Sequence, residues 1–140
     1  MNTNLPAIQD ALYAAIVAQN PGCRVSLGYP LLGTRDEELW VALAGRVEVT
    51  EEWTGGCSRS ESQEIDVRVW VEKPGGTPKS TRDRAFALHA AIEAALATDR
   101  TLGGIADYAS VTRVEIDEGY DDASVMCGIR TTVLVDTTVA

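Results

Sequence analysis

The sequence predicts an α+β fold in which two helices pack on one mostly antiparallel β-sheet, in the order α-β-β-β-β-α-β-β. Two segments show the apolar spacing of helices, and the strand-like segments come in runs between and after them, which is typical of this class. The chain has 140 residues, of which 45% are apolar and 24% are charged. These values are typical of a soluble globular protein, so we expect residues 1–140 to form a single domain.

The first predicted helix occupies residues 4–19. Asn4 is a suitable N-cap, and Pro6 lies in the first turn, where its missing N–H is tolerated. The breaker run at residues 20–22 ends the helix. Its apolar residues recur at helical spacing, at Ile8, Leu12, Ala15 and Ile16. The helix carries no lysine or arginine, so we expect it to pack on a sheet rather than on a membrane surface.

Four strands are predicted next, at residues 23–29, 39–44, 46–53 and 64–72. The last two alternate between faces, as half-buried strands do. One face of these two strands carries Val47, Val49, Ile65, Val67, Val69 and Val71, and the other carries Glu48, Thr50, Glu52, Glu64, Asp66, Arg68, Trp70 and Glu72. Residues 54–62 contain nothing suited to a core, so we expect them to form a long, mobile hairpin tip.

The second helix is predicted to follow the breaker cluster at residues 73–78, with Ser80 or Thr81 as its cap. Its apolar stripe consists of Phe86, Leu88, Ile92, Ala95 and Leu96. The glycines at 103–104 end the helical region. Two strands complete the chain, one through residues 111–116 and one over 124–138, with a turn at 118–122 between them.

The charge of the chain excludes several kinds of partner. There are 21 acidic and 12 basic residues, which gives a net charge of -9. An acidic surface does not hold phosphates by counterion release, so a conventional DNA- or RNA-binding role and docking on anionic membranes are both disfavoured. Residues 1–4 lack the basic and apolar regions of a signal peptide, so we expect the protein to remain where it is made.

Few residues suggest catalysis. His89 is the one histidine, and no accompanying motif supplies a nucleophile and an orienting acid. We therefore interpret it as a helix-surface or edge-of-core residue. Cys23, Cys57 and Cys127 have no CxxC spacing and are interpreted as reduced thiols. No glycine-rich segment matches a phosphate-binding loop, and we expect no cofactor.

The run of carboxylates at residues 117–122 leaves an alternative open. Asp117, Glu118, Asp121 and Asp122 offer oxygen ligands that a hard cation would accept, although the EF-hand pattern is not met. A small acidic metal-dependent enzyme is therefore one alternative. Because aspartates favour turns for backbone reasons alone, we interpret the run as a β-turn.

The remaining features indicate an interaction surface. Trp40, Trp53 and Trp70 all lie on predicted strands, and Trp70 lies on the charged face. That position is explained equally well by a partner surface and by cross-strand pairing with another tryptophan. A long hairpin and two exposed sheet edges are more typical of an assembly subunit than of an enzyme, because a neighbouring copy readily covers such edges.

The chain resembles the tail terminator (tail completion) proteins of long-tailed bacteriophages. The resemblance covers nearly the whole chain and rests on its organisation. Its segments are the helix beginning Leu5-Pro6-Ala7-Ile8, the strand Ile65–Val71, the helix-plus-glycine segment from Ala90 to Gly104, and the final strands at 111–117 and 129–135. Neck and head-closure proteins of the same particles share this layout and remain an alternative.

The resemblance implies a non-enzymatic subunit without cofactors that assembles into a homo-oligomeric ring, usually a hexamer. Such a ring caps the tail tube, contacts the major tail tube protein, and offers a docking face to the head-completion or connector protein. It implies assembly in the host cytoplasm and a final place at the head-proximal end of the tail. The subunit or tube interface is expected at the hairpin and its strand, at Trp53, Arg59, Glu61, Glu64, Arg68 and Trp70.

The acidity of the chain suits a ring through which DNA slides, because a lumen should repel phosphates rather than bind them. We expect lumen-lining carboxylates at Glu48, Glu52, Asp66 and Glu72, with Glu64 beside them. Arg46, Arg59 and Arg68 are then available for ion pairs between subunits.

Overall fold

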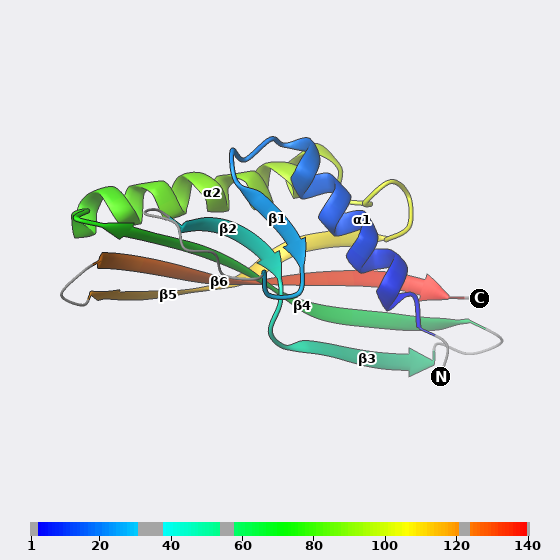
Figure 1. Ribbon diagram of the computed structural model, residues 1–140. Helices are drawn as coiled ribbons and strands as arrows, with labels where there is room; N and C mark the ends of the chain where they lie inside the picture. Colours follow the sequence, from blue (N-terminus) through cyan, green and yellow to red (C-terminus); the bar gives the residue numbers. More distant parts are fainter. Residues whose placement is uncertain (1–2, 31–37, 54–57, 121–123, 140) are drawn as a thin grey trace.

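The predicted α+β fold and element order are confirmed in the computed structural model, which describes residues 3–30, 38–53, 58–120 and 124–139 (Figure 1). The helices are α1 (Leu5–Ala18) and α2 (Pro78–Thr98). The strands are β1 (Arg24–Leu27), β2 (Glu38–Leu43), β3 (Val47–Trp53), β4 (Arg59–Pro74), β5 (Tyr108–Tyr120) and β6 (Ser124–Val139).

The six strands form one sheet: five follow the order β1-β2-β4-β6-β5, and β3 pairs with β4 off this path. Strand β4 is its centre: β6 pairs with all of one edge, while β2 and β3 in turn pair with the other. Only the β1–β2 pair among the described strands is parallel, and the other pairs are antiparallel. The sheet is therefore mostly antiparallel, as predicted.

Both helices lie on the same face of the sheet, as Figure 1 shows, and the main core fills the space between them and the strands. The odd-numbered residues of β4 from Ile65 to Val71 and of β6 face this core. The helices contribute the fully buried side chains Ile8, Leu12, Ile16, Leu88, Ile92 and Leu96. No helix among the described residues has the length and apolar character needed to cross a membrane.

The prediction for Phe86 is wrong. Its side chain is 37% exposed, whereas Ala85 is fully buried in its place. The buried stripe of α2 runs through positions 85, 88, 92 and 95–96, which is i, i+3, i+4 spacing, and position 86 lies outside that stripe.

The two helix starts differ in detail from those predicted. In α1 the side chain of Asn4 makes no capping hydrogen bond, and the hydroxyl of Thr3 instead accepts from the Leu5 N–H over 3.1 Å. Helix α2 begins at Pro78, earlier than predicted, and Thr77 is its cap. Proline suits the first helical position because the N–H it lacks has no partner there.

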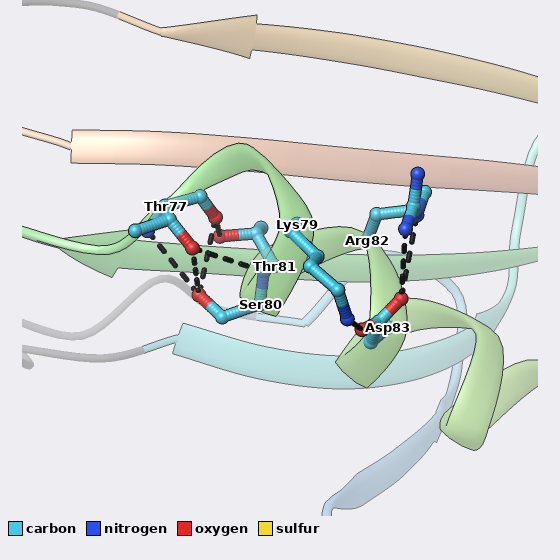
Figure 2. Close-up of polar contacts among 6 residues, drawn as sticks. All are labelled: Thr77, Lys79, Ser80, Thr81, Arg82 and Asp83. Carbon is cyan, nitrogen blue, oxygen red and sulfur yellow. Dashed lines mark hydrogen bonds and ion pairs between the residues drawn. The ribbon is translucent and has the colours of Figure 1, made fainter.

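Figure 2 shows the start of α2. The Ser80 N–H donates to Thr77 Oγ1 over 3.1 Å, and the Thr77 N–H donates to Ser80 Oγ over 3.2 Å, a reciprocal capping box. The Thr81 hydroxyl donates to the Thr77 carbonyl over 2.9 Å. On the exposed side, Lys79 and Arg82 form ion pairs with Asp83 at 2.5 and 3.2 Å. The polar groups at the start of α2, where the connector from β4 ends, are therefore largely hydrogen-bonded.

Two loops are shorter than predicted. Residues 59–62 belong to β4 and pair with both β3 and β6, so they are not part of a mobile tip. Residues 118–120 belong to β5 rather than to a turn. The remainder of each predicted loop, at 54–57 and 121–122, lies outside the described residues.

The edge strand β3 is less buried than its alternating pattern predicts. Val47 is 38% exposed and Trp53 is 65% exposed. The strand lies against β4 at the edge of the sheet, away from the helices in Figure 1. The alternation of apolar residues therefore predicts the strand correctly, but the apolar side chains at Val47 and Trp53 are not buried as such a pattern normally implies.

Candidate interaction surface

The face of the sheet opposite the helices carries an aromatic cluster. Trp40 and Trp70 lie directly opposite each other in the β2–β4 register, and their rings stack with centroids 6.3 Å apart and an interplanar angle of 19°. Tyr29 meets Trp40 edge-on, at 6.2 Å and 89°. Of the two explanations for Trp70, the cross-strand tryptophan pair is thus confirmed. Trp40 is 6% exposed, whereas Trp70 remains half-buried.

These rings form one wall of a groove with a volume of about 430 Å³. We call it the aromatic groove and define it by Tyr29, Trp40, Trp70 and Gly128, with Arg68 and Arg130 at its border. Gly128 makes room for the Trp70 indole, because a Cβ at this position would lie 3.1 Å from the ring. A glycine inside the alternating pattern of β6 is a sign of such close approach, and it is the signal by which the groove could have been found from sequence.

Three donors in the groove wall are buried and form no hydrogen bond with any described residue. They are Trp40 Nε1, Arg68 Nε and Arg130 Nε. Arg68 also forms no ion pair with a described residue, whereas Arg130 is paired with Asp66 and Glu115 at 3.6 and 3.4 Å. Buried polar groups are normally satisfied, so these donors are exceptions to that rule.

Asp66 is buried where the sequence pattern predicts an exposed carboxylate. It is 5% exposed, and its Oδ2 accepts from the Arg46 N–H over 3.0 Å. The Thr132 hydroxyl donates to Oδ1 over 3.3 Å, and Arg130 Nε lies 3.6 Å from Oδ2. The carboxylate is thus buried and bonded within the chain, so it is not available to line a lumen.

The other carboxylates predicted to line a lumen differ in exposure. Glu48, Glu52 and Glu64 are exposed, and Glu48 lies opposite Glu64 in the β3–β4 register. Glu72 is half-buried and accepts from Ser124 Oγ over 3.1 Å. Arginines lie among these acids: Arg46 pairs with Glu48, and Arg113 and Arg130 both pair with Glu115. The open face therefore carries mixed charge.

Trp53 ends β3 and is the most prominent aromatic at that end of the sheet. Its indole is 65% exposed, and the guanidinium of Arg59 lies 5.8 Å from the ring centroid. Arg59 is in turn paired with Glu51 at 3.4 Å and with Glu61 at 4.0 Å. This arrangement orients the indole while leaving much of it open to a partner.

Glu61 is fully buried, so it does not serve as the surface contact that was predicted. Thr3, just before α1, donates to its Oε1, and Gln63 Nε2 donates to the same oxygen over 2.5 Å. The start of the first helix covers this part of β4, which the local sequence pattern does not reveal.

His89 lies at the edge of the core, in agreement with its interpretation. It is 6% exposed, its Nδ1 lies 3.0 Å from the Thr131 hydroxyl, and its Nε2 lies 3.2 Å from Glu93. Thr131 is fully buried on β6. The contacts of His89 are those of a satisfied buried side chain, and Thr131 is a partner that sequence spacing does not indicate.

The next feature is the set of described cysteines and carboxylates that could form a reactive or metal site. Cys23 and Cys127 are free thiols, and burial raises the pKa of each. Within the described ranges no three His, Cys, Asp or Glu side chains gather as a metal site would require. Asp117 and Glu118 are adjacent on β5 and point to opposite faces, while Cys57, Asp121 and Asp122 lie outside those ranges.

Comparison with known proteins gives likeness in structure. No protein-family model and no curated protein sequence matches the chain. A chain from the virion of a native gene transfer agent particle is similar with a TM-score of 0.53 and 15% identity, over 93% of this chain and 98% of that one. The type 4 fimbrial biogenesis protein PilO from Pseudomonas aeruginosa gives a TM-score of 0.39 at 6% identity, over 97% and 70% of the two chains, which is too low a similarity to indicate a shared fold. At 15% identity, the first likeness establishes a shared fold.

Proposed function

We propose that this protein is a structural subunit of a bacteriophage-like virion, and specifically a tail terminator that closes into a ring. The observation that carries the proposal is the likeness to the gene transfer agent virion chain, which covers almost the full length of both chains. A match to one part of a larger chain would support only a shared motif. The open sheet face and the strand edges that no described strand pairs also suit a subunit that is completed by its neighbours.

In this proposal the ring, with six subunits as its expected number, caps the tail tube after assembly in the host cytoplasm and then stays at the head-proximal end of the virion. One side contacts the major tail tube protein, and the other receives the head-completion or connector protein. The accessible residues proposed for subunit or tube contacts are Trp53, Arg59, Glu64, Arg68 and Trp70. Glu61 is excluded because it is buried.

The proposed lumen lining is restricted to the accessible carboxylates Glu48, Glu52 and Glu72, with Glu64 beside them. Their role is to keep DNA phosphates from adhering as DNA passes. The arginines on the same face are largely paired with carboxylates, so they add little net attraction for phosphate. No specific DNA contact and no cofactor is part of this function.

The experiment that tests the function is assembly of the purified protein, alone and with the major tail tube protein from the same genome. Light scattering is expected to give the mass of a closed oligomer, and negative-stain images to show rings, free or seated on one end of each tube. A protein that stays monomeric both alone and with tubes would overturn the proposal. Rings that bind only the head connector and not the tube would replace it with a neck or head-closure role.

A further inference from the structure

We propose that neighbouring copies of this chain join edge to edge, with β1 of one copy pairing antiparallel with β5 of the next. The inference rests on the proposed ring-forming function and names the contact that would build the ring. These two strands are the outer members of the path β1-β2-β4-β6-β5, and no described strand pairs with the outer edge of either. An uncovered edge is a template for pairing with another chain, and the features of the two edges match each other.

The first matching feature is apolar surface. Leu27 on β1 is 52% exposed, and Val114 and Ile116 on β5 are 40% and 47% exposed. Leu27 lies beside Leu43, and Ile116 lies beside Ile129, and both of these partners belong to the main core. The exposed side chains therefore lie on the helix-bearing face of the sheet at both edges. Edge-to-edge pairing would place them side by side and remove apolar surface from water.

The backbone of β1 presents hydrogen-bonding groups along its outer edge. The N–H and C=O groups of successive strand residues point alternately to the two sides of the strand. The Gly28 N–H donates to the Leu43 carbonyl of β2 over 2.8 Å, so the groups of Gly28 and Ser26 point inward. The groups of Val25 and Leu27 therefore point outward.

The backbone of β5 is in the matching phase. The Asp107 N–H donates to the Asp136 carbonyl over 2.8 Å, so the even-numbered residues of β6 point toward β5. Strand β6 keeps one register with β4 along its length, so this also holds for Gly128. Asp117 is the partner of Gly128, and its groups therefore point inward. The groups of Ile116, and of the residue two positions before it, point outward.

One antiparallel register brings the outward-pointing residues together. It places Leu27 opposite Val114 and Val25 opposite Ile116, so that each pair can exchange two backbone hydrogen bonds. A slide by two residues in one direction puts Val25 against Glu118, and a slide in the other direction puts Leu27 against the β-bulge that precedes Val114. A slide by one residue turns the apolar side chains to opposite faces.

The charges in this register are complementary. It places Arg24 of one copy opposite Asp117 of the next, and both residues are exposed. Arg24 lies beside Trp40 on β2, and Asp117 lies beside Gly128 on β6, so both side chains lie on the face opposite the helices. An arginine directly across from an aspartate favours this register over the shifted ones.

The strand directions set the symmetry of the contact. Strand β1 runs parallel to β2, and each further pair along the path to β5 is antiparallel, so β1 and β5 run in opposite directions. A neighbour rotated about an axis roughly along the strands therefore presents its β1 antiparallel to β5. Each copy uses a different edge for each neighbour, which is a heterologous contact and builds a ring when the rotation closes.

The first test exchanges the charges of Arg24 and Asp117. Within one chain they lie four strand spacings apart, roughly 19 Å at about 4.8 Å per spacing, so they meet only between copies. Arg24→Glu and Asp117→Arg should each weaken assembly roughly tenfold in light scattering over a concentration series. The double variant Arg24→Glu/Asp117→Arg should assemble nearly as well as wild type. Lys79→Glu changes the net charge equally at an exposed position on α2, and this matched control should assemble normally.

The second test blocks one edge at a time. Leu27→Pro and Val114→Pro each remove an outward N–H that no ladder within the chain uses, so each variant should fold, as circular dichroism would verify. Each should be monomeric at concentrations where wild type is fully assembled. An equimolar mixture retains one open β1 and one open β5 and should form a 1:1 heterodimer. Tyr120→Pro, at an outward position of β5 beyond the contact, is the matched control and should assemble.

Outcomes that overturn the inference are separable from failure of the proposed function. If folded Leu27→Pro still forms rings, or if the double charge variant assembles no better than the single variants, the contact is wrong while the ring-forming function stands. The contact is also wrong if the mixture of proline variants stays monomeric. Should a proline variant fail to fold, the charge exchange decides the contact alone. If wild type forms no oligomer with or without tubes, both the contact and the ring-forming function are wrong.

Discussion

The carboxylate of Asp66 accepts a 3.0 Å hydrogen bond from the backbone N–H of Arg46, and the Asp66 N–H donates back to the Arg46 carbonyl over 3.0 Å. This exchange occurs where β2 has ended and β3 begins along the same edge of β4. Gly45 precedes it with a φ of +109°, a conformation that favours glycine. Asp66 thus fixes the bend by which the chain passes from β2 to β3 along the edge of β4.

Asp66→Ala is expected to reduce the free energy of unfolding by about 2–3 kcal/mol. The substitution leaves the Arg46 N–H without its acceptor and removes one of the ion-pair partners of Arg130. Asp66→Asn keeps an acceptor for the Arg46 N–H and should cost about half as much. Urea unfolding of both variants measures the difference. Equal losses in the two variants would mean that the hydrogen bond to Arg46 contributes nothing.

The capping box predicts a second stability change. Thr77→Ala removes the acceptor for the Ser80 N–H and should lower the free energy of unfolding by roughly 0.5–2 kcal/mol. Thr77→Asp keeps an acceptor at the cap and serves as the matched control, which should unfold close to wild type. Thermal melts followed at a helix signal provide the comparison. An Ala variant as stable as the Asp variant would contradict the role of Thr77.

Phe86 lies outside the buried stripe of α2, and this position predicts an unusual order of stability losses on substitution. Leu88→Ala, at a fully buried position, should cost about 2–5 kcal/mol. Phe86→Ala removes a larger side chain but one that is 37% exposed, so it should cost clearly less than Leu88→Ala. Denaturant midpoints for the pair settle the order. A larger loss of unfolding free energy for Phe86→Ala than for Leu88→Ala would mean that Phe86 belongs to the core stripe, as the sequence predicts.

Asp99 predicts an acid-dependent loss of stability. Its carboxylate accepts from the Thr101 hydroxyl at 2.6 Å and from the N–H groups of Thr101 and Gly103 at 2.9 and 2.8 Å. These bonds, the hydroxyl first, lower the pKa of Asp99 below its ordinary value of 3.8. The stabilisation is therefore complete above pH 3.8 and is lost as the pH falls through the lower pKa of the folded state.

Asp99→Asn should consequently be less stable than wild type near neutral pH and should show a shallower loss of stability below pH 3.8. Urea midpoints at several pH values, with a carboxylate titration of wild type by NMR, measure both effects. Asp83 also has a lowered pKa, so Asp83→Asn is a useful companion that isolates its separate contribution. Identical acid slopes for Asp99→Asn and wild type would rule out Asp99 as a source of the pH dependence.

The sequence by itself determined the elements and the class of this fold. Apolar spacing at Ile8, Leu12 and Ile16 defines α1, and strict alternation from Ile65 to Val71 defines the centre of β4, because both patterns are local consequences of backbone geometry. It also placed Trp70 on the charged face, with pairing to another tryptophan as one of two explanations.

Only the tertiary structure decided which of these residues are accessible. The sequence pattern predicts that Glu61 and Asp66 are surface carboxylates. In the structure, Glu61 is covered by the residues that begin α1, and Asp66 is enclosed by Arg46, Arg130 and Thr132. The aromatic groove likewise depends on β2, β4 and β6 lying side by side and on Tyr29, which follows β1, meeting them. Burial and proximity arise from contacts between segments that are far apart in the chain. The local pattern of apolar and polar residues does not specify those contacts.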